Sequence, residues 1–208
     1  NPRMPRVDGL PEFGGNRVHL SDVDAWVEDD AELVSLPVKP PSPEDLAIAR
    51  QVCDHIQPRA ILQFGIGAIP DAIGRILSER PLGGFGIHTE EISDGVMRLH
   101  EAGKVSNRKP LYDGFSVATF ALGSGELYAW LGDNPSVRML PVTEVNGASV
   151  LSRLPRLTSV NGALSSDLAG QVAAEWVGGR QYSGAGGHES FVSGAGAAPD
   201  GTSFLCLK

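Results

Sequence analysis

Two adjacent carboxylates, Glu90 and Glu91, follow a short apolar run that ends near His88. An ionised carboxylate that is shielded from bulk water can attack a thioester carbonyl and form a covalent acyl-enzyme anhydride. Glu90 is the stronger candidate for such a nucleophile because it lies nearer the end of the expected strand. The alternative interpretation is that either glutamate only complements the positive end of a helix that begins here.

A first glycine-rich segment lies between an apolar run and a helical pattern. It consists of Gly65, Ile66, Gly67, Ala68 and Ile69. Glycines let backbone amides approach an anion or a developing oxyanion, so this segment is a candidate for ligand binding. Because the dinucleotide-binding fingerprint requires glycine where this chain has proline, that fingerprint is absent. A tight strand-to-helix turn is the alternative.

A second glycine-rich segment contains Gly184, Gly186 and Gly187 and precedes a short helical stretch. Its amides could bind a pyrophosphate or complete an oxyanion hole, although a structural turn explains them as well. Asn146 is expected at the end of a strand, where its amide could orient Glu90. An asparagine of a tight turn is equally consistent with the glycine that follows it.

The elements that must position these residues alternate between apolar runs and helical stripes. The runs predict strands at residues 60–64, 85–88, 117–122, 137–140, 158–164, 172–176 and 203–207. The stripes predict helices from Ser42, at 70–80, at 92–102, from Ser124 and up to Ala195. This order predicts an α/β fold with an open, largely parallel sheet and helices on both faces. Since ligands bind at the carboxyl ends of such strands, residues 65–69 and Glu90 should share one rim.

The first 41 residues lack strong periodicity. They are expected to form an extended arm, with prolines near its start and a proline-rich connector at residues 36–41. Residues 42–208 are expected to form the α/β domain, in which Ser42 can cap the first helix. The chain does not begin with methionine, so we expect a fragment.

Composition limits the possible functions. The formal net charge of −8 and the scattered Lys and Arg residues argue against a nucleic-acid partner. No apolar run approaches ~18 residues, so no membrane span is expected. The histidines show no zinc-ligand spacing, so no metal is expected. Cys53 and Cys206 form no disulfide framework, which favours a reducing, cytoplasmic compartment. Ser165 precedes Ser166 and Asp167, but no nucleophile-elbow sequence surrounds it.

Five segments, in the same order, resemble the acetyl-CoA hydrolase/transferase family, which includes 4-hydroxybutyrate and butyrate–acetate CoA-transferases. The segments are residues 62–70, 86–95, 145–146, 167–172 and 182–187. The family's glutamate nucleophile falls on Glu90, and its steering residue falls on Asn146. The resemblance implies that the CoA-binding and oxyanion loops are residues 65–69 and 184–187. Ser165 and Ser190 depart from the pattern, because relatives often carry glutamate and aspartate there.

The resemblance also implies a reaction. CoA, as a substrate, would move from an acyl-CoA thioester to a small carboxylic acid through a glutamyl-CoA intermediate, and acyl-CoA hydrolysis could accompany this transfer. Family chains have two related α/β halves with the active site between them, and this chain resembles the second half, incomplete at its C-terminus. An N-terminal half-domain or a homo-oligomer is therefore the expected partner. The alternative is a non-catalytic half-domain that binds CoA or a separate N-terminal half.

Overall fold

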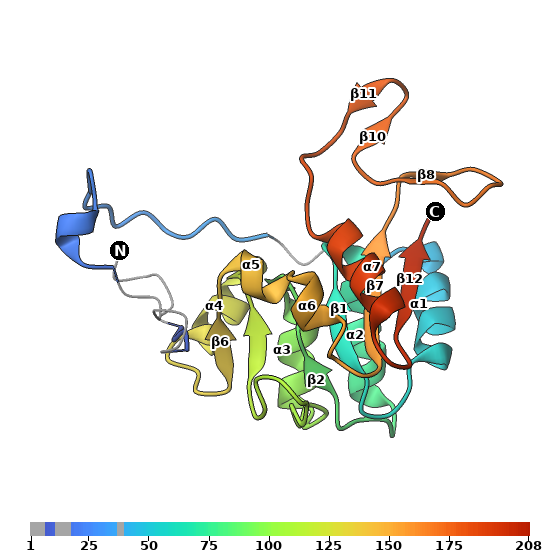
Figure 1. The fold of residues 1–208 in the computed structure, drawn as a ribbon, viewed down its shortest axis with the longest axis horizontal. Helices are drawn as coiled ribbons and strands as arrows, with labels where there is room; N and C mark the ends of the chain where they lie inside the picture. The colour runs from blue at the N-terminus through green and yellow to red at the C-terminus, as the bar shows by residue number, and fades with distance from the viewer. Residues whose placement is uncertain (1–6, 11–17, 37–39) are drawn as a thin grey trace.

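The computed structural model describes residues 7–10, 18–36 and 40–208. The first prolines of the predicted arm and the middle of its connector lie outside the described residues. The described part of the arm, blue in Figure 1, reaches away from the helices and sheet but touches them at several points. Asp8 accepts a backbone hydrogen bond from Met139 over 3.0 Å, and the Val34 carbonyl accepts one from the Tyr128 hydroxyl over 2.9 Å. The division between arm and domain at residue 42 stays a prediction.

Helices and strands are interspersed along residues 40–208, but strict alternation is interrupted, most clearly by the five successive strands β7 to β11. The helices are α1 (Pro43–His55), α2 (Ala68–Glu79), α3 (Asp94–Glu101), α4 (Gly125–Leu131), α5 (Val142–Val145), α6 (Ala148–Leu151) and α7 (His188–Ala197), and a short 3-10 helix, η2, spans Leu20–Asp22 in the arm. The strands are β1 (Ile61–Phe64), β2 (Gly86–Ile87), β3 (Glu91–Ile92), β4 (Ser116–Ala118), β5 (Phe120–Ala121), β6 (Val137–Met139), β7 (Leu157–Gly162), β8 (Ser165–Ser166), β9 (Val172–Ala173), β10 (Trp176–Val177), β11 (Arg180–Gln181) and β12 (Thr202–Cys206).

The central sheet is parallel. Its four strands stand in the order β12-β7-β1-β2, and Ile61 of β1 pairs with Leu157 on one side and Gly86 on the other. An isolated parallel bridge between His88 and Val117 joins this sheet to the parallel pair β4–β6. The prediction of an open, largely parallel sheet is therefore confirmed.

Helices cover both faces of the sheet, and alternation along β1 explains why. Leu62 and Phe64 point into a core cluster shared with α1, α2, α3 and α4. Ile61 points to the opposite face, where it packs in a second cluster with side chains of α6 and α7, including Leu151 and Phe191. Successive side chains of a strand point to opposite faces, so an apolar run such as β1 needs cover on both sides.

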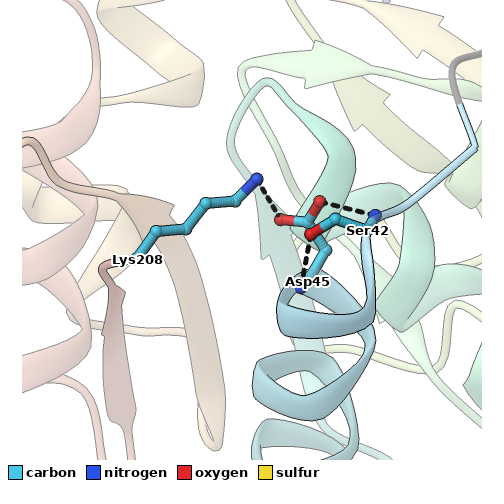
Figure 2. A network of polar contacts seen from close by, with 3 residues as sticks. All are labelled: Ser42, Asp45 and Lys208. Atoms are coloured by element: carbon cyan, nitrogen blue, oxygen red, sulfur yellow. Dashed lines mark hydrogen bonds and ion pairs between the residues drawn. The ribbon is translucent and has the colours of Figure 1, made fainter.

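The first helix begins with the cap that the sequence predicts. The Ser42 hydroxyl accepts a hydrogen bond from the Asp45 amide over 3.2 Å, and the Asp45 carboxylate accepts one from the Ser42 amide over 2.9 Å. These two bonds satisfy amides that the helix itself leaves without acceptors. Lys208 lies 2.7 Å from the same carboxylate, so the last residue of the chain is tied to the start of α1 (Figure 2).

Two predictions near Glu90 are wrong. The predicted strand at residues 117–122 is broken at Thr119 into β4 and β5. The predicted helix at residues 92–102 begins only at Asp94, because Glu91–Ile92 forms β3 and pairs with β5. The glutamates therefore do not open a helix, and the interpretation of Glu90 and Glu91 as helix-start charges is excluded.

Two antiparallel hairpins, β8–β9 and β10–β11, stand between β7 and α7 and project away from the sheet (Figure 1). The predicted turn at residues 167–170 is the tip of the first hairpin, where the Asp167 amide donates to the Gln171 carbonyl over 3.0 Å. The prediction of a turn is therefore confirmed, although the strands that flank it are shorter than expected.

Candidate active site

The backbone around Glu90 is fixed by the neighbouring segment of β4 and β5. The Thr89 amide donates to the Val117 carbonyl over 3.0 Å. The Glu90 carbonyl accepts hydrogen bonds from the amides of Thr119 and Phe120 at 2.9 and 3.1 Å. The break between β4 and β5 thus provides two donors for one acceptor and holds the nucleophile candidate at the end of β2.

Thr89 ties this segment to the end of β1. Its hydroxyl accepts a hydrogen bond from the Phe64 amide over 3.2 Å and donates one to the Phe64 carbonyl over 3.1 Å. Because Thr89 precedes Glu90 and Phe64 precedes the first glycine-rich segment, the two candidate elements are neighbours. The prediction that residues 65–69 and Glu90 share one rim of the sheet agrees with this geometry.

The side chain of Glu90 is held from the opposite direction by the start of α7. The backbone amide of Gly187, the residue that caps α7, donates to Oε2 of Glu90 over 2.9 Å. A Cβ atom at position 187 would overlap this oxygen and would lie 2.7 Å from Nδ2 of Asn146. Glu90, Asn146 and Gly187 therefore converge on one point, and a side chain at position 187 would have to displace Glu90 or Asn146.

Asn146 does not lie at a strand end, contrary to the prediction. It caps the C-terminus of α5, where its backbone amide donates to the Val142 carbonyl over 2.8 Å. Its side-chain Oδ1 is buried and has no hydrogen-bond partner among the described residues. The side-chain amide of Asn146 therefore lies beside Glu90, as the sequence suggests, but it is positioned by the end of a helix and not by the end of a strand.

The neighbouring glutamate lies in a different environment. Glu91 is buried, with 5 % of its surface exposed, and its Oε2 has no hydrogen-bond partner among the described residues. Burial, together with smaller contributions from the negative charges of Asp71 and Glu90, raises the pKa of Glu91 to about 8. Glu91 is thus a neutral acid at neutral pH, while Glu90 is partly exposed at the rim. This difference separates the two carboxylates more clearly than their sequence positions do.

His88 is a buried residue that contacts the end of α5 and the ring of Tyr112. It is fully buried, and its Nε2 lies 2.8 Å from the carbonyl of Val145, the residue before Asn146. Its ring stacks on Tyr112 with 5.9 Å between the ring centres. Burial is the main cause of the low pKa of His88, about 3; the charge of Lys109 adds to this lowering and the Val145 bond opposes it. His88 is therefore neutral at the pH of the cell.

The two glycines of the first segment, Gly65 and Gly67, are each favoured by a different local feature of the structure. A Cβ at Gly65 would lie 2.9 Å from Oδ1 of Asn161, so this glycine makes room for the end of β7. Gly67 caps α2 with φ +128°, a conformation that favours glycine, and open space surrounds it. Ile66 is exposed, whereas Ala68 and Ile69 form the first turn of α2. The first turn of a helix carries amides without intrahelical acceptors, which can bind an anion.

The glycines of the second segment divide into two groups. Gly187 is buried against Glu90, as described above. Gly184 and Gly186 are exposed, and a Cβ at either would meet no atom within 4 Å. The structure thus brings Gly187 to the candidate nucleophile and leaves the other two on open backbone before α7. Ser165 is exposed on β8.

Sequence reasoning missed the polar residues that brace the rim. Gln63 and Asn161 exchange two hydrogen bonds of 3.1 Å between neighbouring strands, and both are buried. Thr89 was not identified as a brace either. The available signal was the single polar side chain of Gln63 inside the apolar run of β1, since a buried amide requires a partner.

The described residues contain neither a cluster of metal ligands nor a membrane-spanning helix. In residues 7–10, 18–36 and 40–208, no group of three or more His, Cys, Asp or Glu side chains could hold a metal ion. Within that same part of the chain, no helix is both long and apolar enough to cross a lipid bilayer.

The fold and the rim together define an α/β domain of the CoA-transferase type, in which a glutamate is held at the carboxyl end of a parallel sheet. The family model for the acetyl-CoA hydrolase/transferase C-terminal domain matches residues 123–208. This match identifies residues 123–208 as a C-terminal domain of the acetyl-CoA hydrolase/transferase family.

Curated relatives are similar along the whole chain. The chain is 38% identical over 210 residues to the 4-hydroxybutyrate coenzyme A transferase of Clostridium kluyveri, covering 100% of this chain and 47% of the relative. It is 37% identical over 206 residues to the succinyl-CoA:cyclohexane-1-carboxylate CoA transferase of Geobacter metallireducens, covering 99% of this chain and 46% of that protein. The chain therefore spans about half the length of the curated relatives it matches.

Solved structures agree with this assignment. RipA from Yersinia pestis matches with a TM-score of 0.85 and 35% identity, over 98% of this chain and 44% of that one. The 4-hydroxybutyrate CoA-transferase of Porphyromonas gingivalis matches with a TM-score of 0.78 and 31% identity, over 91% of this chain and 45% of that one.

Proposed function

We propose that this chain is the glutamate-bearing half of an acyl-CoA:carboxylate CoA-transferase and that Glu90 is its nucleophile. The observation that carries the proposal is the hydrogen bond of 2.9 Å from the Gly187 amide to Oε2 of Glu90, with the Asn146 amide at the same point. Among the described residues, the other carboxylate oxygen of Glu90 accepts no hydrogen bond. One oxygen is thus fixed while the other can attack.

The proposed reaction begins when Oε1 of Glu90 attacks the thioester carbonyl of acyl-CoA. The carbon–sulfur bond breaks, CoA leaves as a thiolate, and an acyl-glutamyl anhydride forms. The thiolate then attacks the glutamyl carbonyl and releases the donor carboxylate, which leaves glutamyl-CoA. An acceptor carboxylate attacks this thioester and releases the thiolate. The thiolate finally attacks the acyl carbonyl of the new anhydride, so that the new acyl-CoA and free Glu90 form together.

The proposed role of Gly187 follows from when Glu90 is charged. The carboxylate is an anion before the first attack and becomes one again as the leaving group of the last step. A fixed amide that donates to an anion stabilises it without reorganisation, and hydrogen bonds to charged groups are stronger than neutral ones. Asn146 would orient the same carboxylate, and its amide could also face the oxygen of an attacked carbonyl.

We further propose that residues 65–69 and 184–187 bind CoA. Open backbone at Gly67, Gly184 and Gly186 supports this role, because a ligand could approach the chain there without meeting a side chain. The amides at the start of α2 support an anionic ligand. Hydrolysis of acyl-CoA would occur if water intercepted either covalent intermediate.

The proposed partner is a second α/β half that covers this rim. Several large apolar side chains are exposed on or near the rim and on the projecting hairpins: Ile66, Phe120, Val142, Leu164, Leu168, Trp176, Val177 and Tyr182. Isolated two-stranded hairpins are marginally stable in water, and exposed apolar groups of this kind favour an interface. The doubled length of the relatives is consistent with such a half in the same chain.

Replacement of Glu90 tests the proposal. The chain should be assayed for CoA transfer from acetyl-CoA to butyrate, alone and mixed with the part of the Clostridium kluyveri relative that it does not cover. Glu90→Gln should abolish turnover, because an amide cannot form the anhydride. Glu126→Gln on the exposed face of α4 is the matched control and should keep full activity. Unchanged turnover in Glu90→Gln would rule out the proposed nucleophile.

The alternative is a half-domain that binds CoA or its partner half without catalysis. The partial coverage of the relatives is the observation that favours it. Calorimetric titration with CoA separates the two functions. Binding of CoA without turnover, in the presence of the missing part, would support the alternative.

A further inference from the structure

The hydrogen bonds of the Asn146 side chain do not account for its position beside Glu90. Its Oδ1 has no hydrogen-bond partner among the described residues, and the helix that it caps, α5, has only four residues. A single helical turn is unstable without tertiary contacts. Something else must therefore hold the end of α5 against Glu90.

His88 provides the first contact. Its Nε2 lies 2.8 Å from the carbonyl of Val145, which is the residue before Asn146. His88 also lies two residues before Glu90, at the end of β2. Residues 88–90 thus carry both the candidate nucleophile, Glu90, and the imidazole that holds the residue before Asn146. Any shift of this segment moves both, so their relative position is preserved.

Tyr112 provides the second contact. Its ring stacks on His88 at an interplanar angle of 23°, and its hydroxyl hydrogen-bonds the carboxylate of Glu144 on α5. Lys109 fixes the loop that carries Tyr112, because its Nζ donates to the carbonyls of Leu111 and Tyr112 at 3.2 and 2.8 Å. Two consecutive residues of α5 are therefore held by two stacked rings.

We propose that His88 and Tyr112 are positioning residues, which clamp the end of α5 so that the Asn146 amide lies beside Glu90. Neither residue touches the reacting atoms. The effect of the clamp on catalysis depends on the proposed function, whereas its effect on the place of Asn146 does not.

The clamp requires one tautomer of His88. The Val145 carbonyl only accepts hydrogen bonds, so Nε2 must carry the proton. Nδ1 is then unprotonated, and it is buried without a hydrogen-bond partner among the described residues. Nitrogen-15 NMR of the imidazole distinguishes protonated from unprotonated ring nitrogens. We expect a protonated Nε2 across the range from pH 6 to 8, and the opposite tautomer would contradict the clamp.

The first test measures the place of Asn146 without any assay of activity. In His88→Leu the donor is lost, so the side-chain amide signals of Asn146 and the backbone signal of Gly187 should shift in nitrogen-15 NMR spectra. His88→Gln keeps a donor and should restore the signals toward those of the unaltered protein. Tyr112→Phe keeps the ring but loses the contact with Glu144, and should give a smaller shift.

His100 provides the matched control. It is largely buried, its Nε2 lies 2.8 Å from the Ser116 hydroxyl, and its ring lies beside Trp130. His100→Leu therefore removes a comparable bond that is made to β4 and not to α5, and should leave the Asn146 signals unchanged. Folded His88→Leu and Tyr112→Phe variants whose Asn146 and Gly187 signals stay in place would overturn the proposal. If His88→Leu does not fold, Tyr112→Phe decides alone.

The second test uses CoA transfer. In the chain mixed with the part of the Clostridium kluyveri relative that it does not cover, His88→Leu should lower kcat at least tenfold with little change in KM, and His88→Gln should recover part of that loss. Combined with Asn146→Ala, His88→Leu should cause no further loss, because the clamp acts through Asn146. An equal, additive loss in the Asn146→Ala background would contradict this route. If neither the unaltered protein nor any variant transfers CoA, the proposed function is wrong. The NMR comparison then still shows whether His88 and Tyr112 position Asn146.

Discussion

The amide of Gly187 donates to the carboxylate of Glu90 over 2.9 Å, although 97 residues separate the two in sequence. The contact joins the end of β2 to the start of α7 across the rim of the sheet. Asn146 meets the same point from the end of α5. Three distant segments thus converge on one carboxylate, and this convergence is the basis of the predictions that follow.

The first prediction concerns the space at position 187. Gly187→Ala should reduce CoA transfer by at least tenfold, because its Cβ would displace Oε2 of Glu90 and press on Asn146. The backbone there has an ordinary negative φ of −78°, so the substitution causes no backbone strain. Steady-state kinetics together with thermal unfolding would separate loss of activity from loss of fold.

Gly196 provides the control for this substitution. It lies within the same helix, and a Cβ there would meet no atom within 4 Å. Gly196→Ala should keep full activity and raise stability by about 0.5–1 kcal/mol, since alanine favours helix over glycine. Equal activity of the two variants would show that the contact between Gly187 and Glu90 does not matter for turnover.

The second prediction concerns the buried acid beside the site. Because the pKa of Glu91 is raised from 4.5 to about 8, the folded protein binds more protons than the unfolded chain between these values. The free energy of unfolding should therefore fall as pH rises through this window, by up to about 1.4 kcal/mol per pH unit from this group. Glu91→Gln removes the titration, so it should stabilise the protein at pH 8 relative to the unaltered chain and much less at pH 5.

Denaturant unfolding at several pH values measures this difference. Other shifted groups, such as His88 and Lys109, are present in both proteins, so their contributions cancel in the comparison. A stability difference between Glu91→Gln and the unaltered chain that does not change between pH 5 and pH 8 would mean that Glu91 titrates normally.

The third prediction concerns the cap of α1. Ser42→Ala removes the hydroxyl that accepts from the Asp45 amide, and should reduce the free energy of unfolding by about 1 kcal/mol. Thermal or urea unfolding would measure the change. Ser193→Ala, on the exposed side of α7, is the control and should change stability by less than about 0.5 kcal/mol. A loss of similar size in both variants would argue against a specific cap.

Much of the scaffold could be predicted because its signals are local. The serine before a proline and an acidic residue predicted the start of α1, and the capping box is present there. The apolar run of β1 predicted a strand covered on both faces, which the two core clusters confirm. The position of Glu90 at a strand end followed from the same pattern.

The remaining details depend on contacts between distant segments. Strand β3 has two residues, which is too short for any periodicity, and it exists because β5 pairs with it. The sequence predicts Asn146 at a strand end, because the four-residue helix that it caps is too short to give a helical pattern. The pairing of Thr89 with Phe64 spans 25 residues, and no local pattern indicates it. The roles of Glu90 and Asn146 in catalysis stay predictions, to which the structure adds their proximity.

The most direct test of the central claim is the mass of the intact protein after incubation with acetyl-CoA, followed by peptide mapping. The measurement should be made on the chain together with the part of a relative that it does not cover, with Glu90→Gln as the control. If Glu90 is the nucleophile, the mass should increase by that of CoA less one water, on the peptide that contains Glu90, and the increase should be absent from the variant. An adduct on another residue, or turnover without any adduct at Glu90, would contradict it.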